Sequence, residues 1–143
     1  MSPTPPRDAA PPLPEPVPEP ADANVARYYS FVETVLLGRQ PAAAARFLAA
    51  DFVEHDGGEE RGRDAFLARL AARQAAFPRA AWTIEFLSAA GDVVVCDATM
   101  AAAAGGPVQW RETVAVRFAG GQMAECWRTG RGDDPASADG TAR

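Results

Sequence analysis

The order of the segments between Asp51 and Trp127 is the feature that most constrains the fold. A short strand segment that ends in a lone His, DFVEH, comes first, and a segment with helical spacing follows, beginning after Gly62 and stopping at Phe77-Pro78. Three extended, mainly apolar segments come next, separated by Gly-rich turns. Proline stops a helix, and paired glycines support the tight turns of hairpins. This order predicts a helix followed by a sheet whose last strands are joined by hairpins.

Two further helices are expected before this region. Segment 21–37 carries apolar residues on one helical face, at Val25, Tyr28, Val32, Val35 and Leu36. Gly38 is a plausible stop, and a short second helix is expected from Pro41, because proline is tolerated in a first helical turn. The third helix has Asp64 in its first turn, where a carboxylate favours the helix dipole. Its expected inward stripe consists of Phe66, Leu67, Leu70, Gln74 and Phe77.

The second half of the chain predicts long strands. Trp82, Ile84 and Phe86 alternate with polar residues, so this strand should be half-buried. Segment 93–104 is apolar on both faces and should be a central strand covered on both sides. Segments 110–118 and 123–129 are the last two expected strands. We predict an α+β fold in which a curved antiparallel sheet wraps around N-terminal helices as a cone with an apolar mouth.

The same segments resemble those of the SnoaL-like polyketide cyclases, a branch of the nuclear transport factor 2-like superfamily. The resemblance covers about residues 22 to 131. The matching residues are Asp51-Phe52-Val53-Glu54-His55, Gly62, Phe66, Phe77-Pro78, Gly91-Asp92-Val93-Val94-Val95, Arg117-Phe118, Gly121, Glu125 and Trp127. It implies a cofactor-free cyclase or isomerase that acts on a polyketide-like small molecule in natural-product biosynthesis.

Two positions depart from the pattern of that family. The family's last strand carries a catalytic Asp at what looks like the position of Arg128, and the His of its preceding strand is replaced by Val114. The acid–base pair that the family uses for aldol cyclisation is therefore not in its usual place. An arginine could instead bind a carboxylate or polarise a carbonyl or enolate oxygen.

Composition excludes several kinds of chemistry. The chain has no lysine, so a lysine Schiff base and a Walker-A phosphate loop are unavailable. It has one histidine, which excludes a multi-His metal site, and no Gly-x-Gly-x-x-Gly follows a strand. A formal net charge of −5 argues against nucleic acid as a partner. No apolar run approaches the ~20 residues of a membrane span. We expect no cofactor, no metal and no membrane partner.

The ends of the chain differ from the middle. The first twenty residues contain nine prolines, which predicts a disordered tail over residues 1–21. Residues 22–131 should form the SnoaL-like domain, and residues 132–143 a second disordered tail. The N-terminal segment lacks the apolar core of a signal peptide. We therefore expect a cytoplasmic protein in which Cys96 and Cys126 are reduced thiols.

Four polar residues are candidate catalytic groups. Glu112 lies on the apolar face of its strand, between Trp110 and Val114, and Asp97 interrupts an apolar strand. The other two candidates are Arg128 and the single histidine, His55. Each also has a structural interpretation: a rim position for Glu112, an arginine pair for Asp97, a salt bridge to Asp97 or Glu112 for Arg128, and a loop cap for His55. We expect Asp97 and Arg128 to face the same cavity.

The remaining candidates concern binding. The expected ligand contacts, each of which could equally be a core residue, are Tyr28, Trp82, Phe86, Trp110, Val114 and Cys126. Glu125 and Trp127 should lie on the outer face of the sheet, where an apolar central strand predicts a homodimer interface. The predicted function is acid–base or electrostatic catalysis in the cone. The alternative is a non-catalytic binding or dimeric partner module of the same fold.

Overall fold

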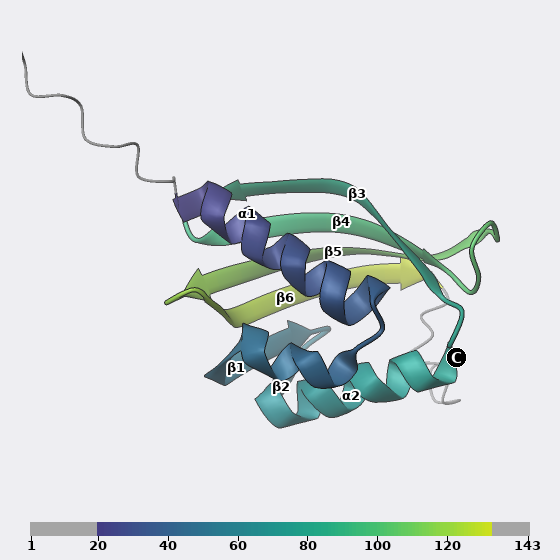
Figure 1. The fold of residues 1–143 in the computed structure, drawn as a ribbon, viewed down its shortest axis with the longest axis horizontal. Helices are drawn as coiled ribbons and strands as arrows, with labels where there is room; N and C mark the ends of the chain where they lie inside the picture. Colours follow the sequence, from purple (N-terminus) through teal and green to yellow (C-terminus); the bar gives the residue numbers. More distant parts are fainter. Residues whose placement is uncertain (1–19, 133–143) are drawn as a thin grey trace, which may run out of the picture.

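The helices lie on one side of a strongly curved sheet in the computed structural model, which describes residues 20–132 (Figure 1). Helix α1 spans Pro20–Phe31 and continues as the π-helix η1, Val32–Leu37. The 3₁₀-helix η2 follows at Pro41–Phe47, and α2 spans Arg63–Ala76. The three expected helical regions are confirmed. The expected tails, residues 1–21 and 132–143, lie almost entirely outside the described residues.

In the described residues, 20–132, six strands form a single sheet with the order β2-β1-β6-β5-β4-β3. The strands are β1 Leu48–Asp56, β2 Glu59–Gly62, β3 Ala81–Ala90, β4 Val93–Ala101, β5 Val108–Ala119 and β6 Gln122–Gly132. Hairpins join β3, β4, β5 and β6, as the Gly-rich turns predict. The turns between β3 and β4 and between β5 and β6 contain glycines at positive φ, such as Gly91 and Gly120.

The expectation of a purely antiparallel sheet is corrected at one edge. Strand β1 pairs with β6 in parallel, with His55 opposite Trp127, and the short strand β2 then pairs back on β1. The two strands form a hairpin that turns at Gly57 and Gly58. The parallel pair is possible because α2 and the four strands β2, β3, β4 and β5 separate β1 from β6 in the chain.

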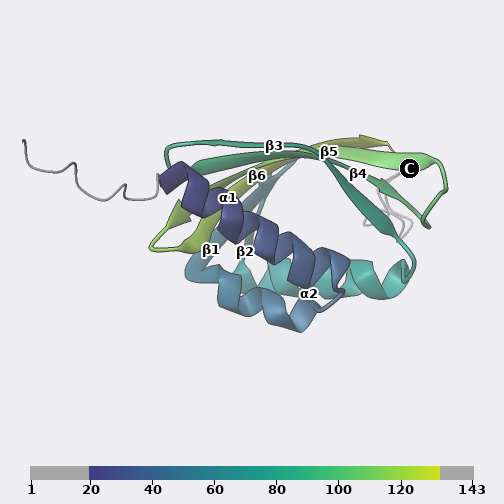
Figure 2. The ribbon, with the colours of Figure 1, turned by 45° about the horizontal axis from the view of Figure 1, so that its top comes forward.

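The helices lie on the concave side of the sheet (Figure 2). The hydrophobic core lies between these two layers. Val35, Phe52, Val94 and Val116 are completely or almost completely buried there. Phe52 packs against Phe66 of α2, with ring centroids 4.9 Å apart. Within residues 20–132 the helices cover only the concave face, so these residues leave the outer face of the sheet open. That outer face is less apolar than expected. Strand β4 ends at Ala101, and its outward side chains are Asp97 and Thr99 as well as Val93 and Val95.

Two β-bulges change which side chains point inward. The register of β3 against β4 shifts between Ile84 and Phe86, so Phe86 lies opposite Asp97 on the outer face. The register of β5 against β6 shifts in the same way, and Met123 rather than Ala124 shares the inner face with Cys126. One extra residue in a strand reverses the alternation beyond it. Phe86, expected as a ligand contact inside the cone, therefore points outward.

Candidate functional site

A cavity of about 80 Å³ lies between α1, η1 and α2 on one side and the concave face of the sheet on the other. Much of its wall is apolar, contributed by residues such as Phe31, Phe66, Ile84 and Val116. Charged side chains enter this wall from α2, β1, β5 and β6. The cavity therefore combines an apolar wall with a small number of fixed polar groups, as small-molecule sites usually do.

The mouth of the cavity lies where η1 and α2 end. Leu37, which is 51% exposed, and Phe77 both line the cavity at this end. Arg39 holds the two helix ends together, because its Nη2 donates to the carbonyl oxygens of Gln74 at 2.7 Å and Phe77 at 3.0 Å. Arg39 has a φ of 54°, a left-handed conformation that is unfavourable for a non-glycine residue. The hydrogen bonds to α2 stabilise that conformation.

Val35 anchors α2 against the π-helix beside the mouth. Its carbonyl oxygen accepts from the backbone N–H of Gln40 at 3.2 Å and from Nε2 of Gln74 at 2.8 Å. The N–H of Gly38 donates to the carbonyl of Glu33 at 2.7 Å, which gives the wide turn of a π-helix. Short π-helical segments are frequent at functional sites. Here the π-helix forms one lip of the cavity.

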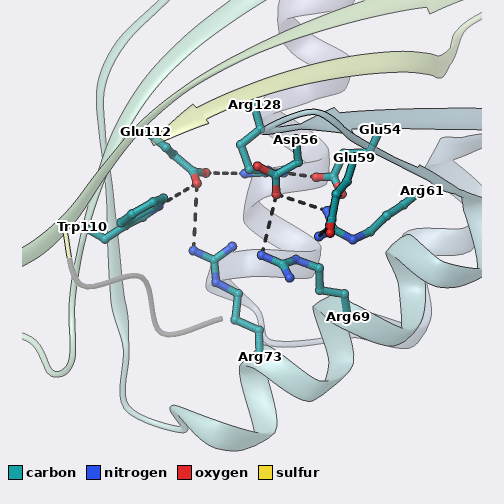
Figure 3. Close-up of polar contacts among 9 residues, drawn as sticks. All are labelled: Glu54, Asp56, Glu59, Arg61, Arg69, Arg73, Trp110, Glu112 and Arg128. Carbon is teal, nitrogen blue, oxygen red and sulfur yellow. Dashed lines mark hydrogen bonds and ion pairs between the residues drawn. The ribbon is translucent and has the colours of Figure 1, made fainter. Parts of the chain in front are cut away.

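Arg128 of β6 joins two buried carboxylates at the inner end of the cavity (Figure 3). Its Nε donates to Oε2 of Glu54 at 2.9 Å, and its Nη1 donates to Oε2 of Glu112 at 2.6 Å. The side chains of Glu54 and Glu112 are only 1% and 4% exposed. These three residues come from β1, β5 and β6, and we refer to them as the Glu54–Arg128–Glu112 triad.

Further contacts surround the Glu112 end of the triad. The indole N–H of Trp110 donates to Oε1 of Glu112 at 2.9 Å, and Nη2 of Arg73 lies 3.9 Å from the same oxygen. The guanidinium of Arg73 also lies over the ring of Trp82, 5.2 Å from its centroid. The triad is thus connected to α2 through Arg73.

A second group of charges surrounds the Glu54 end. Nη1 of Arg61 lies 3.0 Å from Oε1 of Glu54 and 3.1 Å from Oδ2 of Asp56. Nη2 of Arg69 lies 3.7 Å from the same Asp56 oxygen (Figure 3). Both oxygens of Glu54 therefore bind an arginine. This alternation of charges compensates for the cost of burying each one.

The charges of the triad keep its members ionised. Burial alone would raise the pKa of Glu112, but the charges of Arg128 and Arg73, with the hydrogen bond from Trp110, outweigh burial and lower it. Burial opposes the charge of Arg128 as well, yet Glu112 and Glu54 raise its pKa well above the ordinary value. Glu112 is therefore a carboxylate at neutral pH and Arg128 a cation.

Tyr28 and the two cysteines are neutral groups of the cavity wall. Burial raises the pKa of the Tyr28 hydroxyl well above its ordinary value. Burial also raises the pKa of the Cys96 thiol to about 11 and that of Cys126 to about 12. Both thiols are free and buried. Since the thiolate is the nucleophilic form, these cysteines are packing residues, whereas Tyr28 is a hydroxyl that keeps its proton.

Asp97 does not face the cavity, so the expectation that it shares a cavity with Arg128 is wrong. Its side chain lies on the outer face of β4, where Oδ1 accepts a hydrogen bond from Thr113 at 2.7 Å. It lines a separate polar groove there with Glu85 and Arg111. The physical reason is strand alternation: Cys96 and Ala98 face inward, so the residue between them must face outward. The expected arginine pair of Asp97 is replaced by the Thr113 hydroxyl.

His55 also lies on the outer face, between β1 and β6. Its Nε2 is 2.6 Å from Oε2 of Glu125, its Nδ1 is 3.5 Å from Oε2 of Glu60, and its ring stacks on Trp127 with centroids 5.5 Å apart. Oε1 of Glu125 accepts from Nη2 of Arg117 at 3.1 Å. His55 neither lines the cavity nor caps the loop after β1. Glu125 and Trp127 lie on the outer face, as expected.

The expected ligand contacts divide into two groups. Tyr28, Trp82, Val114 and Cys126 line the cavity. Phe86 does not, because the bulge turns it outward, and it is 54% exposed. Trp110 is buried behind Glu112 rather than in the cavity wall. Val114 lies directly opposite Arg128.

Sequence reasoning missed Glu54 and Arg73. Glu54 follows Phe52 by two positions on β1, so strand alternation places it inward with that core residue. Arg73 follows Leu70 by three positions and Phe66 by seven, which is the spacing of the buried face of α2. Both signals are present in the sequence. They are easily overlooked because charged residues are normally assigned to solvent.

Within residues 20–132, no group of three or more His, Cys, Asp or Glu side chains is arranged to hold a metal ion. The helices in this part of the chain are all too short or too polar to cross a bilayer. The cavity wall itself contributes buried carboxylates, arginine cations and a tyrosine hydroxyl.

A curved sheet with helices packed on its concave face around a pocket is the α+β cone of the nuclear transport factor 2-like fold. The family model of the SnoaL-like domain matches residues 25–126, and the chain belongs to that family. No curated protein matches the sequence. The resemblance that the sequence suggested is thus confirmed.

Solved structures share the fold at low identity. AclR from Streptomyces galilaeus, provisionally assigned as a hydroxylase, superposes with a TM-score of 0.69 at 16% identity, over 84% of this chain and 86% of that one. An NTF2-like protein of unknown function from Mesorhizobium loti has a TM-score of 0.67 at 21% identity, over 82% and 98%. IdmH from Streptomyces antibioticus, provisionally assigned as a polyketide cyclase, has a TM-score of 0.62 at 17% identity, over 75% and 91%.

Proposed function

We propose that this protein is a cofactor-free cyclase or isomerase that acts on a polyketide-like small molecule. The observation that carries the proposal is the ionised Glu112–Arg128 pair at the inner end of an otherwise mainly apolar cavity. Burying an ion pair contributes little to stability compared with well-packed apolar side chains. A site that must move a proton and stabilise an oxyanion, in contrast, needs a carboxylate and a cation side by side.

In the proposed reaction, Glu112 takes a proton from a carbon next to a substrate carbonyl. The electron pair of that C–H bond moves to the carbonyl oxygen and forms an enolate, which the arginine charges and the hydroxyl of Tyr28 stabilise. For cyclisation, the enolate carbon attacks a second carbonyl of the same molecule and forms a C–C bond. The resulting alkoxide recovers the proton from Glu112. For isomerisation, the proton returns to a different carbon.

The residues of the proposed mechanism differ from the catalytic candidates that the sequence predicted. Asp97 and His55 are not part of the proposed machinery, since both lie on the outer face of the sheet. Arg128 stands at what looks like the position of the family's catalytic Asp, and in our proposal Glu112 contributes the carboxylate from the neighbouring strand. We propose that the acid–base function has moved from β6 to β5 in this protein.

A second candidate is a binding module of the same fold that does no chemistry. Both oxygens of Glu112 already have partners, Trp110 and Arg73 at one and Arg128 at the other. A carboxylate held in this way is a weaker base than a free one. Catalysis then requires that substrate binding replaces the long contact with Arg73, and a protein in which this does not happen would only hold its ligand.

Deuterium exchange separates the two candidates. A panel of 1,3-diketones and aromatic poly-β-ketone mimics is incubated with the protein in D₂O, and exchange at the α-carbon is followed by NMR. Exchange above the buffer rate is expected, and Glu112→Gln should lower it by at least about 100-fold. Asp97→Asn is the matched control and should leave it unchanged. Binding without exchange would favour the binding module, and equal losses in both variants would contradict the assignment of Glu112.

We further propose that the protein is a homodimer that associates through the outer face of the sheet. This face exposes Phe86 and Trp127, 54% and 40% exposed. The acidic and basic residues of its polar groove lie on different strands. Glu85 and Asp97 lie on β3 and β4, whereas Arg111 and Arg131 lie on β5 and β6. A two-fold axis parallel to these strands would place the acidic half of one copy against the basic half of the other.

A further inference from the structure

Gln74 brings an amide group into the wall of the cavity, among apolar neighbours on α2. It follows Leu70 by four positions and precedes Phe77 by three, so the three residues share one face of the helix, and all of them line the cavity. An apolar side chain at this position would pack without any need for hydrogen bonds. A buried amide, in contrast, requires partners for both of its polar ends.

The orientation of the Gln74 amide is fixed by the π-helix. Its Nε2 donates to the carbonyl oxygen of Val35 at 2.8 Å. The reversed orientation would set the amide oxygen against that carbonyl oxygen, and two acceptors cannot form a hydrogen bond. Arg39 also holds this turn of α2, because it donates to the backbone carbonyl oxygen of Gln74 at 2.7 Å. The nitrogen of the amide is therefore bound to η1, and the oxygen is the end that remains to be satisfied.

That oxygen, Oε1 of Gln74, is buried, and no group within residues 20–132 donates a hydrogen bond to it. Buried polar atoms nearly always have a partner, and an acceptor without one costs free energy. Because Gln74 belongs to the cavity wall, a ligand in the cavity can supply the donor. An amide oxygen only accepts, so the ligand must contribute an O–H or N–H group.

The surroundings of Gln74 favour a hydroxyl over an ammonium group. A single acceptor atom takes one donor, which a hydroxyl provides. An ammonium has three donors, and the others would face apolar residues such as Leu36 and Phe77. The guanidinium of Arg39, which is bound to the same turn of α2, also disfavours a second cation at this place.

We infer that the ligand of this cavity carries a hydroxyl group, a phenol or an enol, and donates it to Oε1 of Gln74. The inference deepens the proposed function, and it rests on that function only in taking the cavity as a small-molecule site. In the proposed reaction the carbonyl of the substrate lies near Glu112 at the inner end. Gln74 lies nearer the mouth, one helical turn from Phe77. An acceptor at one end and the cationic groups at the other would fix the direction in which the substrate lies.

The test uses single-ring ligands, which suit a cavity of about 80 Å³. Titration followed by NMR compares meta- and para-hydroxyacetophenone with acetophenone, which has the same carbonyl end. At least one hydroxylated ligand should bind at least about fivefold more tightly than acetophenone, a difference of about 1 kcal/mol. Gln74→Met removes the acceptor at nearly constant volume and should reduce this preference to within about twofold.

Gln40→Met is the matched control and should keep the preference. It replaces an exposed glutamine that caps no helix through its side chain. Four results would contradict the inference: equal or weaker binding of both hydroxylated ligands, an undiminished preference in Gln74→Met, an equal loss in Gln40→Met, or no binding of any of the three ligands below about 10 mM.

If circular dichroism shows that Gln74→Met is unfolded, the parent protein decides the question. Nuclear Overhauser effects between the side-chain amide protons of Gln74 and the ring of the tighter hydroxylated ligand are then expected, and their absence contradicts the inference. Because these experiments measure binding alone, a hydroxyl preference without deuterium exchange would argue against the catalytic proposal and leave the inference intact. Exchange without a hydroxyl preference would have the opposite meaning.

Discussion

Nη1 of Arg128 lies 2.6 Å from Oε2 of Glu112, and this contact joins the inner faces of β5 and β6 at the end of the cavity. The same guanidinium binds Glu54 of β1 through Nε. One side chain thus connects three neighbouring strands, including the parallel pair β1–β6 that lies next to the edge strand β2. The triad serves the architecture as well as the proposed chemistry, and both roles can be tested.

Replacing Arg128 should destabilise the fold strongly. Arg128→Met leaves two buried carboxylates without their shared cation, and removing one partner of a buried ion pair costs about 3–5 kcal/mol. Urea denaturation followed by circular dichroism measures this loss. Arg131→Met, on the exposed part of the same strand, is the matched control and should change stability by less than about 0.5 kcal/mol. Similar midpoints for the two variants would show that the triad does not hold the sheet together.

Stability should fall in acid because of Glu112. The pKa of Glu112 is lowered in the folded protein from the ordinary value of 4.5. A group whose folded pKa is lowered stabilises the fold above its unfolded pKa, and this contribution is lost as the pH falls through the folded pKa. The free energy of unfolding should therefore decrease below about pH 4.5.

The same pH series in Glu112→Gln should be flatter between pH 4.5 and pH 2, since the amide does not titrate. Glu33→Gln, an exposed side chain of η1, is the control and should follow the parent profile. A parent profile that is already flat in this window would mean that Glu112 is not held in its ionised form by Arg128.

A methyl group at Gly130 should displace Trp110. A Cβ at Gly130 would lie 2.0 Å from Cζ2 of Trp110, and no such contact is tolerated. The indole would have to move away, which would weaken its hydrogen bond to Glu112. Gly130→Ala should cost about 1–3 kcal/mol and reduce deuterium exchange. Gly62→Ala, where nothing lies within 4 Å, should have little effect on either quantity. An unchanged near-ultraviolet tryptophan signal in Gly130→Ala would argue against the displacement.

The proposed dimer can be tested by charge exchange. Arg111→Glu should weaken association at least about tenfold in sedimentation experiments, since it sets like charges against the acidic half of a second copy. Adding Glu85→Arg to the same chain should restore part of the affinity, because the two halves are complementary again. A parent protein that stays monomeric at all concentrations would exclude the dimer, and an unaffected Arg111→Glu dimer would place the interface elsewhere.

The architecture could be predicted to a large extent from local signals. Helical spacing in segment 21–37 and at Phe66 and Leu70, with the stop at Pro78, indicated helices that the structure contains. Alternation placed Glu112 on the inner face with Val114, and it placed Glu125 and Trp127 outside. These features depend on the pitch of a helix and the period of a strand, which neighbouring residues determine by themselves.

Only the tertiary structure decided what the charged residues meet. A bulge at Glu85 turned Phe86 away from the cavity, and no local signal marked the residue at which the alternation breaks. The partners in the triad are 74 and 16 positions apart, and they meet because β1 pairs in parallel with β6. The two-residue alternation of a strand determines which face of the sheet a side chain occupies. The residue that this side chain contacts depends on which distant strand lies alongside. For this reason the sequence could identify Arg128 and Glu112 as candidates. Only the folded sheet brings Arg128 to Glu54 and Glu112 near Arg73.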